Sequence, residues 1–275
     1  MRTNGMNKKR INKTKVVLTV LLVILISTTI YITYITVFMP QTEPPHDEGL
    51  TGKRAVIVDQ LSLNHPNQTF VNLNMKTLQD YGYIVDYIPG EKVTVEFFRN
   101  LPTYNYKIII LRVHVAESIE MQQTAFFTNE EYSESKYIVE QMSQTLGVAK
   151  YPDSNLSDDT TYFAISPRFI QNSMIGEFND TAIIMMGCFS LKYPKMAEAL
   201  ITKGANVCVG WNETVSATHT DYATSVLIEH LIVNNESISQ AVYNTMTEVG
   251  IDPNYYSSLK YYPQEAKDTT LKTNY

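Results

Sequence analysis

The feature that most constrains this chain is an uncharged run of 24 residues, Val16–Met39, which is rich in valine, leucine and isoleucine. A helix of that length crosses a hydrocarbon core of about 30 Å. Basic residues lie between positions 8 and 15, directly before the run, and the positive-inside rule keeps such residues in the cytoplasm. A cleaved signal peptide is the alternative, but its apolar segment is shorter and ends at small residues. The sequence predicts a cytoplasmic tail (1–15), a transmembrane helix (16–39) and a C-terminal part outside the cytoplasm at the cell membrane.

Charge is distributed unevenly along the chain. Residues 1–42 hold six basic residues and no acidic ones, whereas the remainder holds 16 basic and 28 acidic residues, a net charge of −12. An acidic body of this kind argues against nucleic acid as a partner. Segment 40–52 contains three prolines and is typical of a short stiff spacer. Sequons for N-glycosylation follow the spacer and fit an extracellular glycoprotein; they begin at Asn67, Asn155, Asn179, Asn212 and Asn235.

The body of the chain, 53–250, alternates apolar runs of strand length with helical patterns. Near-continuous apolar strands indicate a mostly parallel sheet covered by helices on both faces. The sequence therefore predicts an α/β fold, a three-layer α/β/α sandwich. A polar segment, 116–160, is expected to be an insertion with a helix near 134–145, and 251–275 a peripheral C-terminal tail. The expected strands are 53–59, 83–88, 107–113, 182–187 and 205–211, and the main expected helices are 69–81, 195–203, 218–233 and 239–249.

A cysteine and a histidine follow two of the expected strands. In parallel sheets, sites form beyond the carboxyl ends of the strands. His114 follows the third strand and Cys188 follows the fourth. A histidine within hydrogen-bond reach activates a thiol as a nucleophile. The residues alone leave a second interpretation open, in which Cys188 is an ordinary buried thiol and His114 an ordinary polar residue.

Four segments carry a resemblance to the caspase-like clan of cysteine peptidases, which includes caspases, gingipains, clostripain, separase and CHAT-type domains. The segments are Ile108–Ala116 (IIILRVHVA), Phe163–Ile175 (FAISPRFIQNSMI), Thr181–Ser190 (TAIIMMGCFS) and Met196–Trp211 (MAEALITKGANVCVGW). The likeness extends from about residue 53 to about residue 249. It implies a caspase-like fold and amide hydrolysis through an acyl-enzyme, with Cys188 as the nucleophile and His114 handling the proton.

The resemblance also implies an oxyanion hole and a substrate pocket. The oxyanion donors would be the N–H of Cys188 and an N–H that follows His114. The clan has His-Gly where this chain has His114-Val115, and a β-branched residue resists backbone conformations that glycine adopts readily. In related peptidases that cleave after basic residues, an acid and an aromatic residue shape the pocket. Asp59 and Trp211, each at the end of a strand, are the candidates for substrate binding here.

The sequence predicts no cofactor and no metal. It holds no G-x-G-x-x-G motif and no P-loop, and its five histidines lack the HExxH spacing. Cys208 lies inside an expected strand and is interpreted as a core residue. The function expected from the resemblance is a membrane-anchored extracytoplasmic cysteine peptidase that acts on peptides or proteins. The alternative is a non-catalytic surface module of the same fold that acts in protein interaction or scaffolding.

Overall fold

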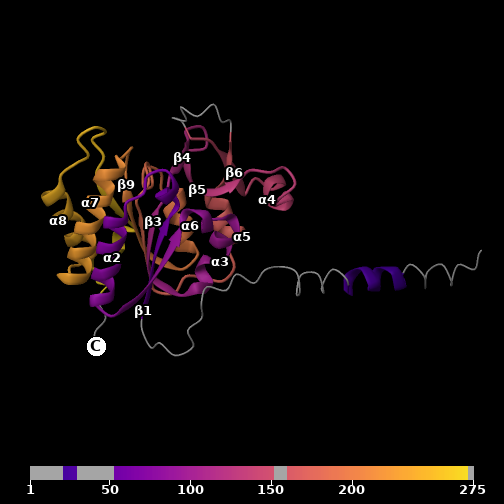
Figure 1. Ribbon diagram of the computed structural model, residues 1–275, viewed down its shortest axis with the longest axis horizontal. Helices are drawn as coiled ribbons and strands as arrows, with labels where there is room; N and C mark the ends of the chain where they lie inside the picture. The colour runs from indigo at the N-terminus through magenta and orange to yellow at the C-terminus, as the bar shows by residue number, and fades with distance from the viewer. Residues whose placement is uncertain (1–20, 30–52, 152–159, 272–275) are drawn as a thin grey trace, which may run out of the picture. The chain divides into compact units, whose positions relative to one another are not determined.

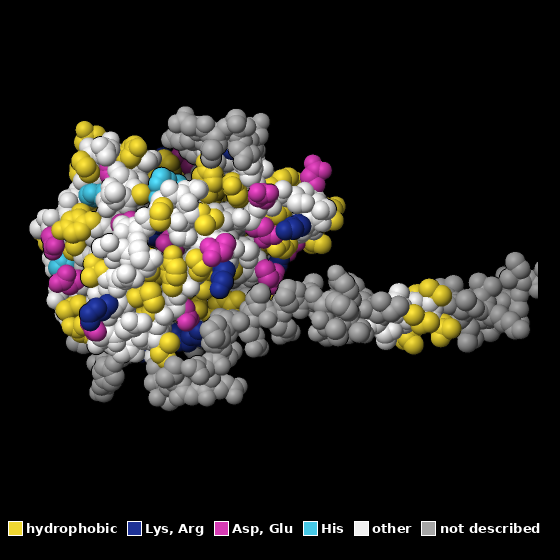
Figure 2. All heavy atoms as spheres, in the orientation of Figure 1, with side chains coloured by type: hydrophobic (Ala, Val, Ile, Leu, Met, Phe, Trp, Pro, Cys, Tyr) yellow, Lys and Arg dark blue, Asp and Glu magenta, His cyan; other side chains and the backbone are white. Residues whose placement is uncertain are grey.

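A computed structural model describes residues 21–29, 53–151 and 160–271 (Figure 1). Contacts divide the chain into two units, 1–49 and 50–275. In the first unit, residues 21–29 form a helix whose apolar side chains are about half exposed or more (Figure 2). The hydroxyl of Thr28 donates to the carbonyl of Ile24 at 3.0 Å, so the helix satisfies this polar group within its own backbone.

The predicted anchor is described only in part. Among the described residues, no helix is both long and apolar enough to cross a membrane. The rest of 16–39, the tail 1–15 and the whole spacer 40–52 lie outside the described residues. The transmembrane helix therefore stays a prediction.

The second unit is built on a six-stranded sheet in the order β10-β9-β8-β3-β1-β2. Five strands are parallel, and only β10 runs antiparallel, against β9. This confirms the prediction of a mostly parallel sheet. The strand β10 comes from 251–275, so this segment contributes an edge strand and is not only a peripheral tail. The strands are β1 (Lys53–Asp59), β2 (Tyr83–Pro89), β3 (Tyr106–Arg112), β8 (Thr181–Met185), β9 (Ala205–Trp211) and β10 (Leu259–Tyr262).

Side chains alternate along these strands and build a core on each face of the sheet. Ile57 and Ile110 pack with the first set of helices, whereas Val58 and Ile109 pack with the second set. The helices lie on opposite sides of the sheet, as the sequence predicts (Figure 1). The first set is α2 (Gln68–Asp80), α7 (Ala217–Ile228) and α8 (Ile238–Val249), and the second set is α3 (Val95–Asn100), α5 (Pro167–Ser173) and α6 (Lys195–Thr202).

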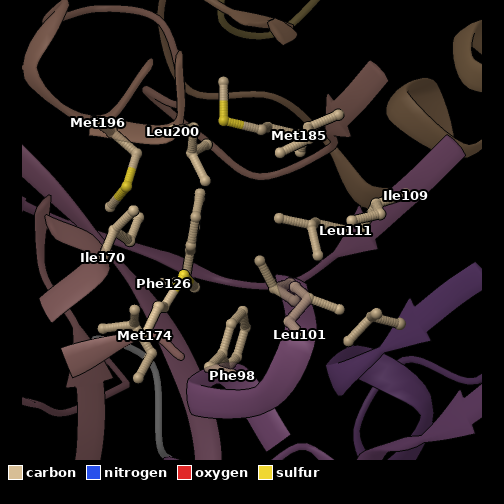
Figure 3. Packing of buried hydrophobic residues seen from close by; sticks show 14 of the residues in the cluster. Phe98, Leu101, Ile109, Leu111, Phe126, Ile170, Met174, Met185, Met196 and Leu200 are labelled. Atoms are coloured by element: carbon tan, nitrogen blue, oxygen red, sulfur yellow. The ribbon is translucent and has the colours of Figure 1, made fainter. Parts of the chain in front are cut away.

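The second core also receives side chains from a smaller sheet. Figure 3 shows Phe126 of this sheet pointing toward Phe98 and Ile170, which come from α3 and α5. Each fully buried Leu, Ile or Phe side chain contributes about 1.5–3 kcal/mol to folding. The short helices of the unit are η1 (Gln60–Leu63), η2 (Gly90–Lys92), η3 (Leu101–Tyr104), the π-helix η4 (Glu229–Val233) and η5 (Gln264–Asp268).

The segment 116–160, expected to be an insertion, contributes strands to the smaller sheet. The four strands of this sheet are antiparallel and lie in the order β4-β5-β7-β6. The helix expected near 134–145 is reduced to α4 (Ile138–Met142), because Tyr137 before it adopts a left-handed conformation with φ of 50°. The strands are β4 (Val115–Ser118), β5 (Gln123–Glu131), β6 (Leu146–Ala149) and β7 (Tyr162–Ile165).

Candidate active site

The strands that precede His114 and Cys188 are neighbours in the main sheet. Leu111 of β3 pairs with Met185 of β8 in parallel register. The ladder continues one step further, because the N–H of Met186 donates to the carbonyl of Leu111 at 2.9 Å. His114 and Cys188 each lie three residues beyond the Leu111–Met185 pair. The fold therefore brings the two residues to the same edge of the sheet.

Gly187 is the point at which the two segments touch. A Cβ at Gly187 would lie 2.5 Å from the carbonyl oxygen of Val113, and it would also overlap Cγ2 of Val115. Only glycine permits this approach, because any larger side chain would push the segments apart. The residue before Cys188 is thus packed between the two neighbours of His114.

The register of β4 determines where the N–H of Val115 points. The N–H of Phe127 donates to the carbonyl of His114 at 2.9 Å, and Val115 is opposite Phe126. In an antiparallel pair, hydrogen-bonded and non-hydrogen-bonded positions alternate. Val115 therefore occupies a non-hydrogen-bonded position, and its N–H points away from β5. A β-branched residue after His114 thus still leaves this N–H outside the strand ladder.

The thiol of Cys188 contacts the loop that follows β9. Its Sγ accepts from the N–H of Val215 at 3.5 Å and donates to the carbonyl of Val215 at 3.6 Å. Burial raises the pKa of Cys188, the Val215 backbone opposes this rise, and the Asp252 carboxylate adds to it. Cys188 is therefore a protonated thiol at neutral pH.

The imidazole of His114 packs among aromatic rings. Its centroid lies 5.0 Å from that of Tyr151 and 5.9 Å from those of Phe127 and His65. Burial is the largest cause that lowers the pKa of His114 to about 4, and the electrostatic effects of His65 and Arg112 contribute to this shift. The ring is neutral at pH 7 and can accept a proton. Within the described residues, no hydrogen bond joins this ring to the Cys188 thiol.

A glutamine that the sequence analysis missed holds the backbone of His114. The N–H of His114 donates to Oε1 of Gln60 at 2.9 Å. The side-chain amide of Gln60 in turn donates to Oδ1 of Asn129 at 2.6 Å and to the hydroxyl of Tyr151 at 2.5 Å. Gln60 directly follows β1 and is fully buried. It therefore ties the His114 segment to both sheets.

Asp59, predicted to bind substrate, is part of a buried ion-pair triad. Its Oδ1 lies 2.7 Å from Nη1 of Arg112, and Arg112 Nε lies 2.7 Å from Oδ1 of Asp221. Asp59 and Arg112 are each only 1% exposed. Burial raises the pKa of Asp59, although the Arg112 guanidinium opposes the rise. The Asp59 carboxylate is thus paired inside the protein with Arg112, which lies two residues before His114.

Trp211, the second substrate-binding candidate, is also buried. Its indole N–H donates to the hydroxyl of Thr220 at 2.9 Å, and its ring lies 5.5 Å from that of His219. Cys208 in the same strand is completely buried, and burial raises its pKa. Both cysteines are free thiols. Within the described ranges, no group of three or more His, Cys, Asp or Glu side chains is arranged to hold a metal.

Lys192 connects the loop after Cys188 to its two flanking segments. Its ammonium lies 3.0 Å from Glu117 of β4 and 3.3 Å from Glu213, which follows β9. The hydroxyl of Tyr193 donates to the same Glu117 carboxylate at 2.8 Å. Glu117 is therefore held by two residues of the loop that follows Cys188.

The low pKa of His114 predicts a pH-dependent loss of stability. The pKa is about 4 in the folded protein and 6.5 in the unfolded chain. The unfolded chain therefore binds more protons between these values, and stability is lost as the pH falls from about 6.5 to 4. At about 1.4 kcal/mol per pKa unit, this loss is about 3 kcal/mol. We expect His114→Phe to remove this component when unfolding free energies at pH 7 and pH 4.5 are compared. An equal pH dependence in both proteins would contradict the assignment.

Comparison with known proteins gives limited similarity. No protein-family model matches the sequence, and no curated protein matches it. Among solved structures, the chain is similar to one described as "Crystal structure of the Arg specific cysteine proteinase gingipain R (RGPB)". The superposition has a TM-score of 0.42 with 12% sequence identity and covers 81% of this chain. It covers 45% of the gingipain chain, so this chain spans less than half of that protein's length.

Proposed function

We propose that this chain is a cysteine peptidase of caspase-like fold that is anchored in a membrane and hydrolyses amide bonds outside the cytoplasm. Cys188 is the nucleophile and His114 is the general base. The observation that carries the proposal is the adjacency of the two strand ends. β3 and β8 pair in register up to the residues before the site, and Gly187 contacts both neighbours of His114.

The charge states of the two groups indicate how the thiol is activated. Cys188 is protonated and His114 is neutral at pH 7, because burial raises the pKa of the first and lowers the pKa of the second. The thiol proton therefore moves to the imidazole as sulfur bonds to the scissile carbonyl carbon. The imidazolium then returns the proton to the leaving amine, and water hydrolyses the acyl-enzyme. Before attack, the thiol must leave its two hydrogen bonds with Val215.

Two backbone N–H groups serve the developing oxyanion. The N–H of Cys188 lies at the nucleophile itself, and the register of β4 directs the N–H of Val115 away from β5. Fixed N–H donors stabilise the charge that develops on the carbonyl oxygen during attack. This arrangement does not need glycine after His114.

The anchor is the uncharged run at 16–39. Support comes from the absence of charge over 24 residues and from the helix at 21–29, whose apolar side chains are exposed. A helix that is apolar on all sides needs an apolar environment. The basic tail at 1–15 then lies in the cytoplasm, and the acidic domain lies outside.

A specific observation favours a second candidate function, a non-catalytic interaction module of the same fold. In an activated thiolate–imidazolium pair, the pKa of cysteine falls and that of histidine rises. Here both shifts run in the opposite direction. The hydrogen bonds of the Cys188 thiol also go to the Val215 backbone and, among the described residues, not to His114.

Hydrolysis of a library of internally quenched peptides distinguishes the two functions. The full chain, purified in detergent, is compared with Cys188→Ala and with Cys208→Ala. A peptidase loses cleavage with the first variant and keeps it with the second, because Cys208 is a core residue. Absence of cleavage by the wild-type chain, or equal cleavage by Cys188→Ala, would favour the non-catalytic module.

A further inference from the structure

A cavity of about 810 Å³ lies against the smaller sheet, between the first half of β5 and helices α5 and α6. Pockets that bind ligands in proteins are about 300–1,000 Å³. Neither Cys188 nor His114 lines this cavity. Its wall includes Glu120, Thr124, Gly147, Arg168 and Glu198.

One edge of β5 is open at this cavity. Strand β7 pairs with β5 from Phe126 onward, so the residues of β5 before Phe126 have no strand partner on that side among the described residues. Thr124 is opposite Glu117 of β4, three steps along the pair from the hydrogen-bonded His114–Phe127 position, and is therefore at a non-hydrogen-bonded position. Positions alternate along the pair, so the N–H and C=O of Thr124 point away from β4 and toward the open edge. A free N–H and C=O at a strand edge can pair with an added strand.

The side chain of Thr124 supplies a second, independent observation. Thr124 is 1% exposed, and its hydroxyl has no hydrogen-bond partner among the described residues. A buried hydroxyl without a partner destabilises the fold, and such groups are rare in native proteins. A ligand in the cavity that reaches this hydroxyl would satisfy it.

The charges around the cavity suit a peptide. Within the described part of the chain, no ion pair involves Glu120, Glu198 or Arg168, so charges of both signs are available at the wall. Lys195 also lines the cavity, but its ammonium donates to the carbonyl of Met121 at 2.6 Å. Charges of both signs beside an open strand edge suit an extended peptide that carries both acidic and basic side chains.

We infer that this cleft binds an extended peptide segment that pairs with β5 at Thr124 and bonds the Thr124 hydroxyl. The inference rests on the proposed function in one respect, that the bound segment belongs to the substrate. Ala116 and Glu117, which follow His114, line the cleft, and Glu117 is held by Lys192 of the Cys188 loop. A peptide seated in the cleft is therefore directed toward the candidate active site, and the cleft is a docking site beside it.

Binding is measured on a background that cannot cleave. The full chain carrying Cys188→Ala is incubated in detergent with a synthetic octapeptide library, and retained peptides are identified by mass spectrometry. Adding Thr124→Val is expected to raise Tm by roughly 2–4 °C, because it removes an unpaired buried hydroxyl. It is also expected to weaken binding of the retained peptides about tenfold, the cost of one hydrogen bond.

Two further variants make the result specific. Thr245→Val is the matched control, because the Thr245 hydroxyl in α8 is also buried without a partner and does not line the cleft. It is expected to raise Tm equally and leave binding unchanged. Gly147→Leu narrows the cleft and is expected to abolish binding. It is compatible with the fold, because an added Cβ at Gly147 meets only Ala164, at 3.6 Å.

The outcomes separate this inference from the proposed function. The inference that the cleft binds a peptide is contradicted if no peptide is retained, or if binding is unchanged in both Thr124→Val and Gly147→Leu. Binding that these two variants weaken supports it, whether or not the wild-type chain hydrolyses peptides. Binding without hydrolysis would support the peptide-binding role of the cleft and contradict only the proposed peptidase activity. The domain would then be a peptide-binding module.

Discussion

Replacing Arg112 by methionine is expected to lower the free energy of unfolding by about 3–5 kcal/mol, because it leaves buried carboxylates without their counterion. The guanidinium of Arg112 is 1% exposed and binds the carboxylates of Asp59 and Asp221 at 2.7 Å each. It also donates to the carbonyl of His65 at 2.9 Å. These bonds join β1, β3, α7 and the segment after η1 beside His114. Chemical denaturation of the full chain measures the effect.

Arg54→Met is the matched control for this prediction. Arg54 also binds one aspartate, Asp86, but its side chain is 20% exposed, so water replaces part of the lost bond. We expect a loss of about 1 kcal/mol at this more exposed pair. Equal losses for the two arginines would show that the Arg112 triad does not stabilise the carboxyl edge of the sheet as described.

His114→Gln is expected to lower kcat/KM for peptide hydrolysis by about 10²–10⁴-fold, the usual contribution of a general base. Glutamine keeps a polar side chain at the site but cannot take the thiol proton. For the wild-type chain, the proposed mechanism predicts that activity is lost only when the imidazole is protonated. Because the pKa of His114 is about 4, kcat/KM is expected to fall as the pH drops through about 4 and to be level between about pH 5 and 7. The measurement is kcat/KM across this range.

The exposed residue His65 provides a control for the pH profile. Its positive charge lowers the pKa of His114, and the two rings lie 5.9 Å apart. His65→Gln keeps the base and is therefore expected to retain activity while moving the acid limb to higher pH. An acid limb that is unchanged in His65→Gln, or activity that survives in His114→Gln, would show that His114 is not the base.

The strands of the main sheet were predictable because their apolar runs are continuous. The expected spans 53–59 and 205–211 coincide with β1 and β9. The smaller sheet was not predictable in the same way. Its strands β4, β6 and β7 have four residues each, and the side chain that fixes β5, Phe126, is held by the distant helices α3 and α5. Similarly, β10 is a strand only because β9 offers it an edge.

The candidate site shows the same division between local and tertiary information. The sequence placed His114 and Cys188 after strands, and the pairing of β3 with β8 brings those strand ends together. It did not reveal Gln60, since this contact depends on the smaller sheet. The ion pair of Asp59 does have a signal in the sequence. Arg112 ends another apolar strand, and a buried arginine needs a carboxylate partner; the register places it opposite Asp59.

Covalent labelling with a peptidyl chloromethyl ketone library tests most directly whether His114 activates Cys188. The full chain in detergent is followed by intact mass and peptide mapping. The proposed mechanism predicts one adduct, on Cys188, that is absent in Cys188→Ala and forms at least about 100-fold more slowly in His114→Gln. Iodoacetamide, which does not occupy the peptide site, should label the folded chain slowly at pH 7, because the pKa of Cys188 is raised. Absence of the Cys188 adduct, or equal rates in the wild-type and His114→Gln chains, would contradict the mechanism.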